Sequence, residues 1–212
     1  MKFLLSILII PLILSYSIGI YYSFSKFSLL PYGQFYFWTF GILSFVLNFV
    51  FRKQTSFWSI FKHELTHNIF AILTFNKPTG FTVKKGEGGL FEYSGRSNFM
   101  ITLSPYFYPT ISSFILLIFL FDLNYKIPFY IILGLASGFD LASSIKDIHP
   151  FQSDLTKYGY VFSILFVVFG IILFWGALFS FVMGGWELSI DYLKYGIIKI
   201  IETSKVMINN VA

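Results

Sequence analysis

The chain has 212 residues, of which 56% are hydrophobic, 22% are aromatic and only 12% are charged. Soluble domains carry about 25% charged residues, so this composition excludes an ordinary soluble protein and predicts an integral membrane protein. The net charge of +5 comes from scattered Lys and Arg side chains, which suits contact with the head groups of a lipid bilayer and gives no support for nucleic-acid binding. The absence of cysteine excludes thiolate ligands, so a metal ion would have to be held by nitrogen and oxygen atoms.

Six apolar stretches approach the ~20 residues that a helix needs to cross a bilayer core. In chain order they are Phe3–Tyr22, Phe35–Phe51, Ser56–Phe75, Asn98–Phe121, Pro128–Ile145 and Tyr158–Gly184. The first also resembles a signal peptide, but it lacks an Ala-x-Ala-like cleavage site, so we expect a retained helix. Pro105 and Pro109 should kink or break the fourth, because proline lacks a backbone donor. The sequence therefore predicts an all-α polytopic membrane bundle of about six transmembrane helices.

The last part of the chain follows the pair Gly184-Gly185. From Trp186 to Asn210, apolar residues alternate with charged ones at near-helical spacing, which predicts an amphipathic helix on the membrane surface or on the bundle. We therefore divide the chain into a membrane domain, 1–185, and an amphipathic C-terminal segment, 186–212. Alternating the six spans distributes Lys and Arg almost evenly between the two sides, so the positive-inside rule does not choose an orientation.

A polar stretch, Asn76–Ser97, separates the third and fourth apolar stretches. Its Thr, Phe and Val residues on either side of Gly86-Glu87-Gly88-Gly89 are typical of a short β-hairpin, and a plain loop with a glycine turn is the alternative. A hairpin has an unpaired edge to which an extended peptide can add by backbone pairing. We therefore interpret Gly88 and Gly89 as a candidate substrate-docking position.

The third apolar stretch contains the motif His63-Glu64-Leu65-Thr66-His67. Residues four apart lie on one face of a helix, so His63 and His67 can bind one metal ion while Glu64 handles a metal-bound water. The alternative is a surface helix with two solvated histidines. Ionisable residues at the centre of a membrane helix cost about 2.5 to 3.5 kcal/mol each, which favours a metal as the compensating partner.

A catalytic zinc ion usually has three protein ligands and one open position, so one ligand must come from elsewhere in the chain. The candidates are Asp140, near the end of the fifth apolar stretch, and Asp147, His149 and Asp154, between the fifth and sixth stretches. Asp154 could instead cap a helix, and Asp147 could lie in a solvated loop beside Lys146. Asp140, inside the fifth stretch, could be a buried carboxyl that bonds to a neighbouring helix or could support the metal site.

These residues resemble the site-two protease family, the zinc metalloproteases that work inside membranes. The resemblance covers about residues 57–160 and rests on the histidine motif, the glycine-containing hairpin, Leu103-Ser104-Pro105, and the run Pro150-Phe151-Gln152-Ser153-Asp154-Leu155. Ser-Asp followed by an apolar residue is similar to a small bacterial subgroup of that family. The chain lacks the Leu-Asp-Gly sequence that often contains the third ligand.

The resemblance implies Zn²⁺ bound by His63, His67 and Asp154, with Glu64 as the catalytic acid and base. Asp140 is then the reserve third ligand. The implied activity is hydrolysis of peptide bonds in membrane-embedded protein substrates, by a multi-pass protein of the cell (inner) membrane.

Two other classes of function remain open. A metal or proton transporter also contains intramembrane histidines and carboxylates, although the acidic residues here gather in one region and the chain shows no paired broken segments. A non-catalytic membrane scaffold could use zinc as a structural ion, and such a site differs from a catalytic one in its closed fourth position.

Overall fold

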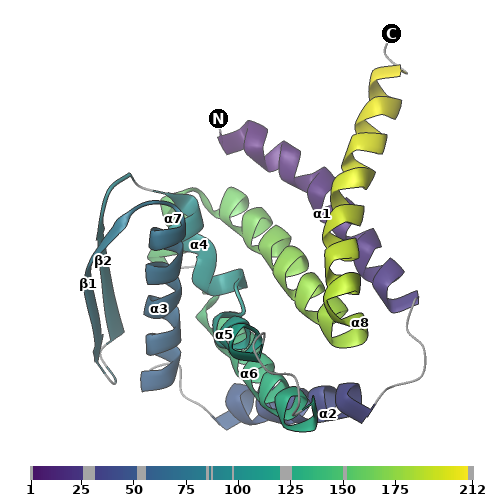
Figure 1. Cartoon of the computed structure of the whole chain (residues 1–212). Helices are drawn as coiled ribbons and strands as arrows, with labels where there is room; N and C mark the ends of the chain where they lie inside the picture. The colour runs from purple at the N-terminus through teal and green to yellow at the C-terminus, as the bar shows by residue number, and fades with distance from the viewer. Residues whose placement is uncertain are drawn as a thin grey trace. The chain divides into compact units, whose positions relative to one another are not determined.

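The computed structural model describes residues 2–25, 32–51, 56–84, 86, 88–96, 98–119, 126–149 and 152–209. Its packing separates two units, Met1–Leu30 with Gly159–Ala212, and Pro31–Tyr158. Figure 1 shows a mostly helical chain with one hairpin. The elements are α1 (Lys2–Ser25), α2 (Tyr32–Phe51), α3 (Phe57–Leu73), β1 (Lys77–Lys84), β2 (Gly88–Ser94), α4 (Phe99–Phe107), α5 (Thr110–Phe119), α6 (Lys126–Asp147), α7 (Ser153–Lys157) and α8 (Tyr160–Asn209).

Helices α2 and α6 form the main helix pair of the 31–158 unit, and glycine allows them to approach closely. A Cβ atom built on Gly134 would lie 2.4 Å from the Phe37 carbonyl oxygen, and one on Gly138 would lie 2.2 Å from the Gly41 carbonyl oxygen. Small residues spaced four apart permit such backbone contact between helices. The Ser44 hydroxyl adds a hydrogen bond of 2.7 Å to a carbonyl of α6.

The two helices run in the same direction. Near their N-terminal ends Gly33 meets Tyr130, and near their C-terminal ends Lys146 donates to the Asn48 carbonyl oxygen. If both cross a membrane, the chain between them must cross it an odd number of times. The six alternating spans predicted from sequence require two crossings there, so this alternation disagrees with the structure.

Four helices are long and apolar enough to span a membrane, at Leu5–Ser25, Gly33–Phe51, Lys126–Asp147 and Tyr160–Lys199. The predicted count of six spans is not confirmed. Helix α3 has 17 residues, fewer than the ~20 of a full span. Helices α4 and α5 are bent by 82° at their break, and together they form either one broken span or a re-entrant loop. The exposed side chains of the spans include many large hydrophobic residues, as expected for an integral membrane protein.

Buried polar groups support the break between α4 and α5. Pro109 has no N–H to donate to the Pro105 carbonyl, as a continuous helix would require. The fully buried Lys62 ammonium donates to that carbonyl at 2.8 Å. On the other side of the break, the Asp140 carboxylate accepts from the Ser112 backbone N–H at 2.8 Å, which satisfies a donor at the N-terminus of α5. Thus α3 and α6 hold the two ends of the broken segment.

The predicted hairpin is present as an antiparallel pair of strands, β1 and β2, between α3 and α4 in the chain. The register pairs Lys84 with Gly88 and Lys77 with Ser94, with an irregularity between Pro78 and Gly80. Gly88 has a φ of 114°, in the region that favours glycine. Both strands pack beside α3 (Figure 1).

In the other unit, α8 consists of two helices that fold back at Gly184 and Gly185, where Gly185 has a φ of 70°. The Ser189 hydroxyl donates to the Ala177 carbonyl oxygen and the Tyr192 hydroxyl to the Ile172 carbonyl oxygen, so the start of the second helix packs against the end of the first. The C-terminal helix was predicted to lie on the membrane surface or on the helix bundle, and in the structure it packs on other helices. The proposed functional boundary at residue 185 stays a prediction, because packing does not reveal which part carries the activity.

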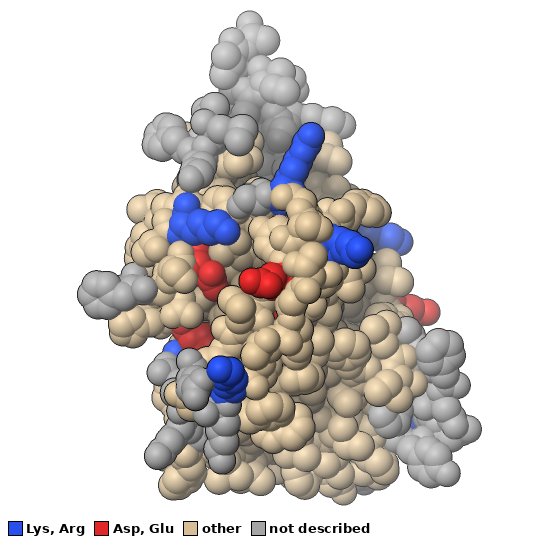
Figure 2. Space-filling view, turned by 90° about the vertical axis from the view of Figure 1, so that its left-hand side faces the viewer, with Lys and Arg blue, Asp and Glu red and all other residues tan. Residues whose placement is uncertain are grey.

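Figure 2, which faces the hairpin side of Figure 1, shows a surface on which uncharged residues predominate. The Lys, Arg, Asp and Glu side chains are few, and several acidic ones lie among basic ones. Such a surface agrees with a protein that is largely surrounded by lipid.

Candidate metal centre

Helix α3 presents the histidine motif, and a polar stripe beside the histidines is held by neighbouring helices. Ser56 caps the helix by accepting from the Ser59 backbone N–H. The Ser59 and Ser143 hydroxyls lie 2.9 Å apart, and Thr66 bonds to Thr110. Because these contacts prevent rotation of α3, they fix the direction in which His63 and His67 point.

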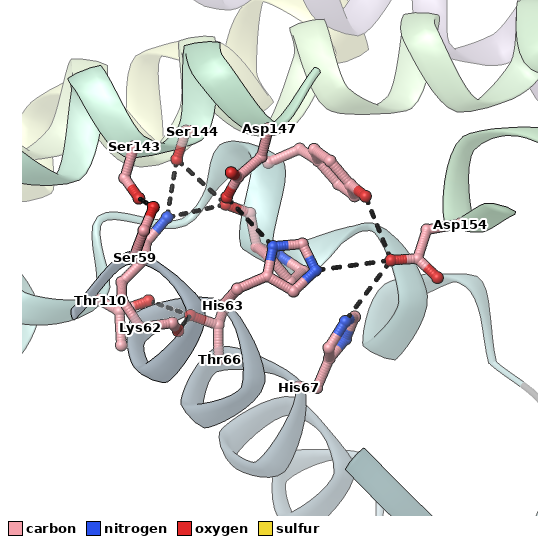
Figure 3. Close-up of polar contacts among 12 residues, drawn as sticks. Ser59, Lys62, His63, Thr66, His67, Thr110, Ser143, Ser144, Asp147 and Asp154 are labelled. Atoms are coloured by element: carbon pink, nitrogen blue, oxygen red, sulfur yellow. Dashed lines mark hydrogen bonds and ion pairs between the residues drawn. The ribbon is translucent and has the colours of Figure 1, made fainter. Parts of the chain in front are cut away.

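Both imidazoles point toward Asp154, which lies on α7 (Figure 3). The Asp154 Oδ2 atom lies 3.5 Å from Nε2 of His63 and 3.6 Å from Nε2 of His67. The potential ligand atoms of the three residues all lie within 4.8 Å of one another. Two ligand atoms at about 2.1 Å from a tetrahedral metal ion are about 3.4 Å apart. The spacing to Asp154 therefore fits one shared ion.

The other nitrogen of each imidazole has its own acceptor. The His67 Nδ1–H donates to the Ile101 carbonyl oxygen at 2.7 Å, and His63 Nδ1 lies 3.1 Å from Asp147 Oδ2. Since a carbonyl oxygen only accepts, His67 must carry a proton on Nδ1, so in the neutral imidazole the Nε2 lone pair faces Asp154. Metal-binding histidines in proteins show this pattern, in which the outer N–H is held by a carbonyl or a carboxylate.

Asp154 supplies negative charge to the cluster. Burial by itself would raise the pKa of its carboxyl, but the hydrogen bonds and positive charges that His63 and His67 supply when protonated outweigh burial and hold this pKa below its ordinary value. A bound metal ion would take the place of those protons, because neutral imidazoles direct their Nε2 lone pairs at the point that the carboxylate also faces. The three side chains therefore suit one shared cation.

Aromatic side chains hold the ligand residues in place. The Tyr106 hydroxyl of α4 donates to Asp154 Oδ2 at 3.1 Å, and its ring meets the His63 ring edge-on with a centroid distance of 5.4 Å. Phe91 of β2 stacks on His67, with an interplanar angle of 9° and a centroid distance of 5.7 Å. The hairpin and α4 thus take part in the cluster directly.

Glu64 faces the hairpin, and its side chain is largely buried. A Cβ atom built on Gly89 would lie 2.4 Å from the Glu64 Cγ atom, so only glycine leaves room for this carboxylate. Two cavities meet at His63, Glu64, Gly89 and Gln152. One has a volume of about 340 Å³ and also contains His67, Asp154 and residues of β2, and the other has a volume of about 270 Å³ and also contains Asp147.

The structure separates the residues that were predicted as alternatives. Asp147 contacts His63 and thus has the position of site support rather than of the third ligand of the cluster. Asp140 is fully buried at the break between α4 and α5, and His149 is exposed and lies outside the cluster. Gly88 and Gly89 both line the smaller cavity. The alternative role of Asp154 as a helix cap does not fit, because Gln152 is the N-cap of α7. The alternative position of Asp147 in a solvated loop does not fit either, because Asp147 is the last residue of α6.

Sequence reasoning missed Tyr106, Lys62 and the Ile101 carbonyl group. Lys62 could have been identified from the sequence, because Ser59, Lys62 and Thr66 form a polar stripe at helical spacing within an apolar helix. Tyr106 and Ile101 could not, because aromatic and aliphatic residues are abundant throughout the chain.

Comparison with known protein families gives a match over most of the chain. The model of the family described as Peptidase M50B-like matches residues 37–190, which include the whole cluster and the hairpin. No curated protein and no solved structure matches the chain.

Proposed function

The chain belongs to the Peptidase M50B-like family, which is part of the site-two protease group, and we propose that it is a zinc-dependent endopeptidase that cleaves membrane-embedded protein substrates. The observation that carries this proposal is the convergence of His63, His67 and Asp154 beside Glu64. We further propose that the protein is a multi-pass component of the cell (inner) membrane.

Zinc suits the donors of the cluster. Two imidazole nitrogens and one carboxylate oxygen form a ligand set that catalytic zinc sites use, with one position left open. The chain has no cysteine that could close the site as a fourth thiolate ligand. When bound there, zinc would supply Lewis-acid polarisation of the scissile carbonyl group and acidification of a water molecule.

Glu64 is our candidate for proton transfer. It neighbours His63 in the helix and lines both cavities with it. In this role the carboxylate removes a proton from the attacking water and delivers it to the leaving amine as the C–N bond breaks. Burial against the hairpin restricts the rotamers of Glu64 and so keeps the carboxylate near the cluster.

Strand β2 is our candidate for substrate docking. A transmembrane helix resists hydrolysis because its carbonyl groups are already hydrogen-bonded, so a substrate segment must unwind first. Gly89, Leu90, Phe91 and Tyr93 of β2 line the cavity that contains the cluster, and β2 has a strand partner on one side, β1, in the sheet that the structure describes. An extended substrate could therefore pair with the other edge of β2 and pass Glu64 at Gly89. Cleavage that survives replacement of Gly88 and Gly89 by proline would contradict this docking.

The main experiment measures zinc content and cleavage in the same purified preparations. We expect near-stoichiometric zinc in the wild type, its loss in His67→Ala and Asp154→Ala, and its retention in Glu64→Gln with loss of hydrolysis. His149→Ala is the matched control and should keep both properties. The substrates are membrane proteins whose single transmembrane segment contains a helix-breaking residue.

The outcomes separate this proposal from the other functions. Zinc binding without cleavage of any unwound membrane segment would favour a scaffold. Metal flux into sealed vesicles that contain the purified protein would favour a transporter. Absence of zinc from the wild type would contradict the protease proposal itself.

A further inference from the structure

Asp154 lies on a shorter and less firmly capped helix than the two histidines do. His63 and His67 belong to a helix of 17 residues that is capped by Ser56. Asp154 belongs to α7, which has five residues, and the N-cap residue Gln152 makes no side-chain capping hydrogen bond. The Asp154 side chain is also more exposed, at 24%, than those of His63 and His67, at 12% and 9%. Contacts from outside α7 must therefore determine where this carboxylate points.

Tyr106 provides such a contact from the protein interior. The residue is fully buried and follows Pro105, whose carbonyl oxygen accepts hydrogen bonds from Lys62 and from Ser144. Because this part of α4 is held by α3 and α6, the Tyr106 hydroxyl has a fixed position. It donates at 3.1 Å to Oδ2 of Asp154, the same oxygen atom that faces both imidazoles.

The ring of Tyr106 adds a second constraint. It packs edge-on against the His63 ring, at an interplanar angle of 87°. The side-chain amide of Gln152, at the start of α7, lies within hydrogen-bonding reach of the Tyr106 hydroxyl. A hydroxyl oxygen can accept from such an amide while its own hydrogen points at Asp154. One buried tyrosine thus connects α4, α7 and the first histidine of the motif.

We propose that Tyr106 is a positioning residue of the metal centre, which holds Asp154 as the third ligand through the hydroxyl hydrogen bond. This inference rests on the proposed function, because it assumes that His63, His67 and Asp154 bind one ion. Partners that orient a ligand typically change metal affinity by about 10- to 100-fold when they are removed. Tyr106 is expected to act on affinity and on ligand geometry, without itself contacting the reacting atoms.

The test is metal affinity of the full-length protein in detergent, measured by competition with a chromophoric chelator. Tyr106→Phe keeps the ring and removes the hydroxyl, so we expect zinc affinity to fall by about 10- to 100-fold. Tyr108→Phe is the matched control, because Tyr108 lies outside the cluster in the same part of the chain. Binding of Co²⁺ gives a second readout, since its visible absorption spectrum reports ligand geometry and should change in Tyr106→Phe alone.

Two further measurements make the result decisive. The metal-free proteins should melt at the same temperature, which would show that the loss of affinity does not arise from a damaged fold. If Tyr106→Phe is poorly produced, Gln152→Leu removes the amide that lies beside the hydroxyl and should weaken zinc binding less strongly. Zinc affinity within about twofold of wild type, with an unchanged Co²⁺ spectrum, would overturn the assignment of Tyr106.

Failure of the metal site as a whole would look different. Asp154→Ala serves as the reference variant for the third ligand. Unchanged zinc affinity in Asp154→Ala would contradict the proposed metal centre, whereas a loss in Asp154→Ala with no loss in Tyr106→Phe would contradict only the role of Tyr106.

Discussion

Gly89 of the hairpin and Glu64 of the histidine motif are in such close contact that no side chain fits between them. A Cβ atom at residue 89 would lie 2.4 Å from Cγ and 2.6 Å from Oε1 of Glu64. The carboxylate that we propose for proton transfer is therefore positioned by the backbone of the strand that we propose for substrate docking.

The substitution Gly89→Ala should displace Glu64 and reduce hydrolysis by at least about 100-fold, because a general base contributes about 10²- to 10⁴-fold to a rate. Zinc content should not change, since no ligand residue moves. The measurement is kcat on a cleaved membrane substrate together with zinc per chain. Val83→Ala, at the cross-strand partner of Gly89, is the control and should retain the wild-type rate.

The contact between Asp147 and His63 predicts a second effect. Asp147→Ala removes the acceptor at 3.1 Å from His63 Nδ1 and thereby allows the imidazole to turn or to place its proton on the other nitrogen. We expect zinc affinity to fall by about 10- to 100-fold, as measured by chelator competition. His149→Ala, which changes a residue outside the cluster two positions away, should have wild-type affinity; equal affinities in both variants would rule out this role of Asp147.

Lys62 and Asp140 predict an effect on stability. Lys62→Met leaves the Pro105 carbonyl without its ammonium donor and removes the positive charge that favours the buried Asp140 carboxylate. A hydrogen bond from a charged group contributes about 1.5–3 kcal/mol to the folding free energy, so Lys62→Met alone should destabilise the protein by about that amount. The double variant Lys62→Met with Asp140→Asn should lose less stability than the sum of the two single changes. Denaturant unfolding in mixed micelles measures the three values, and strict additivity would show that the two residues do not interact.

Gly138 predicts the consequence of separating α2 from α6. A larger side chain there meets the Gly41 carbonyl oxygen and the Phe45 backbone nitrogen, which cannot move without shifting α2. Gly138→Val should destabilise the protein by about 1–3 kcal/mol or more, as overpacking does. The melting temperature in detergent tests this expectation. Leu135→Val changes an exposed position on the same helix and should melt within a degree or two of wild type; a similar loss in both would argue against the glycine contact.

The sequence alone was sufficient for the membrane class, the hairpin and the candidate metal motif. These features depend on local spacing: His63 and His67 share a helix face because they are four residues apart, and the glycine-rich turn lies between residues of high strand propensity. The family membership was also predictable, because each of the motifs that carry the resemblance can be read from local sequence.

The tertiary structure decided which acidic residue joins the histidines, how the break in α4–α5 is stabilised and how α2 and α6 are oriented. Asp140, Asp147 and Asp154 have similar chemistry, and only packing places Asp154 Oδ2 opposite both Nε2 atoms while Asp147 contacts Nδ1 of His63. The parallel arrangement of α2 and α6 depends on backbone contacts at Gly134 and Gly138. Local propensity and hydropathy do not encode such contacts between segments far apart in the chain, because they arise only when the helices pack.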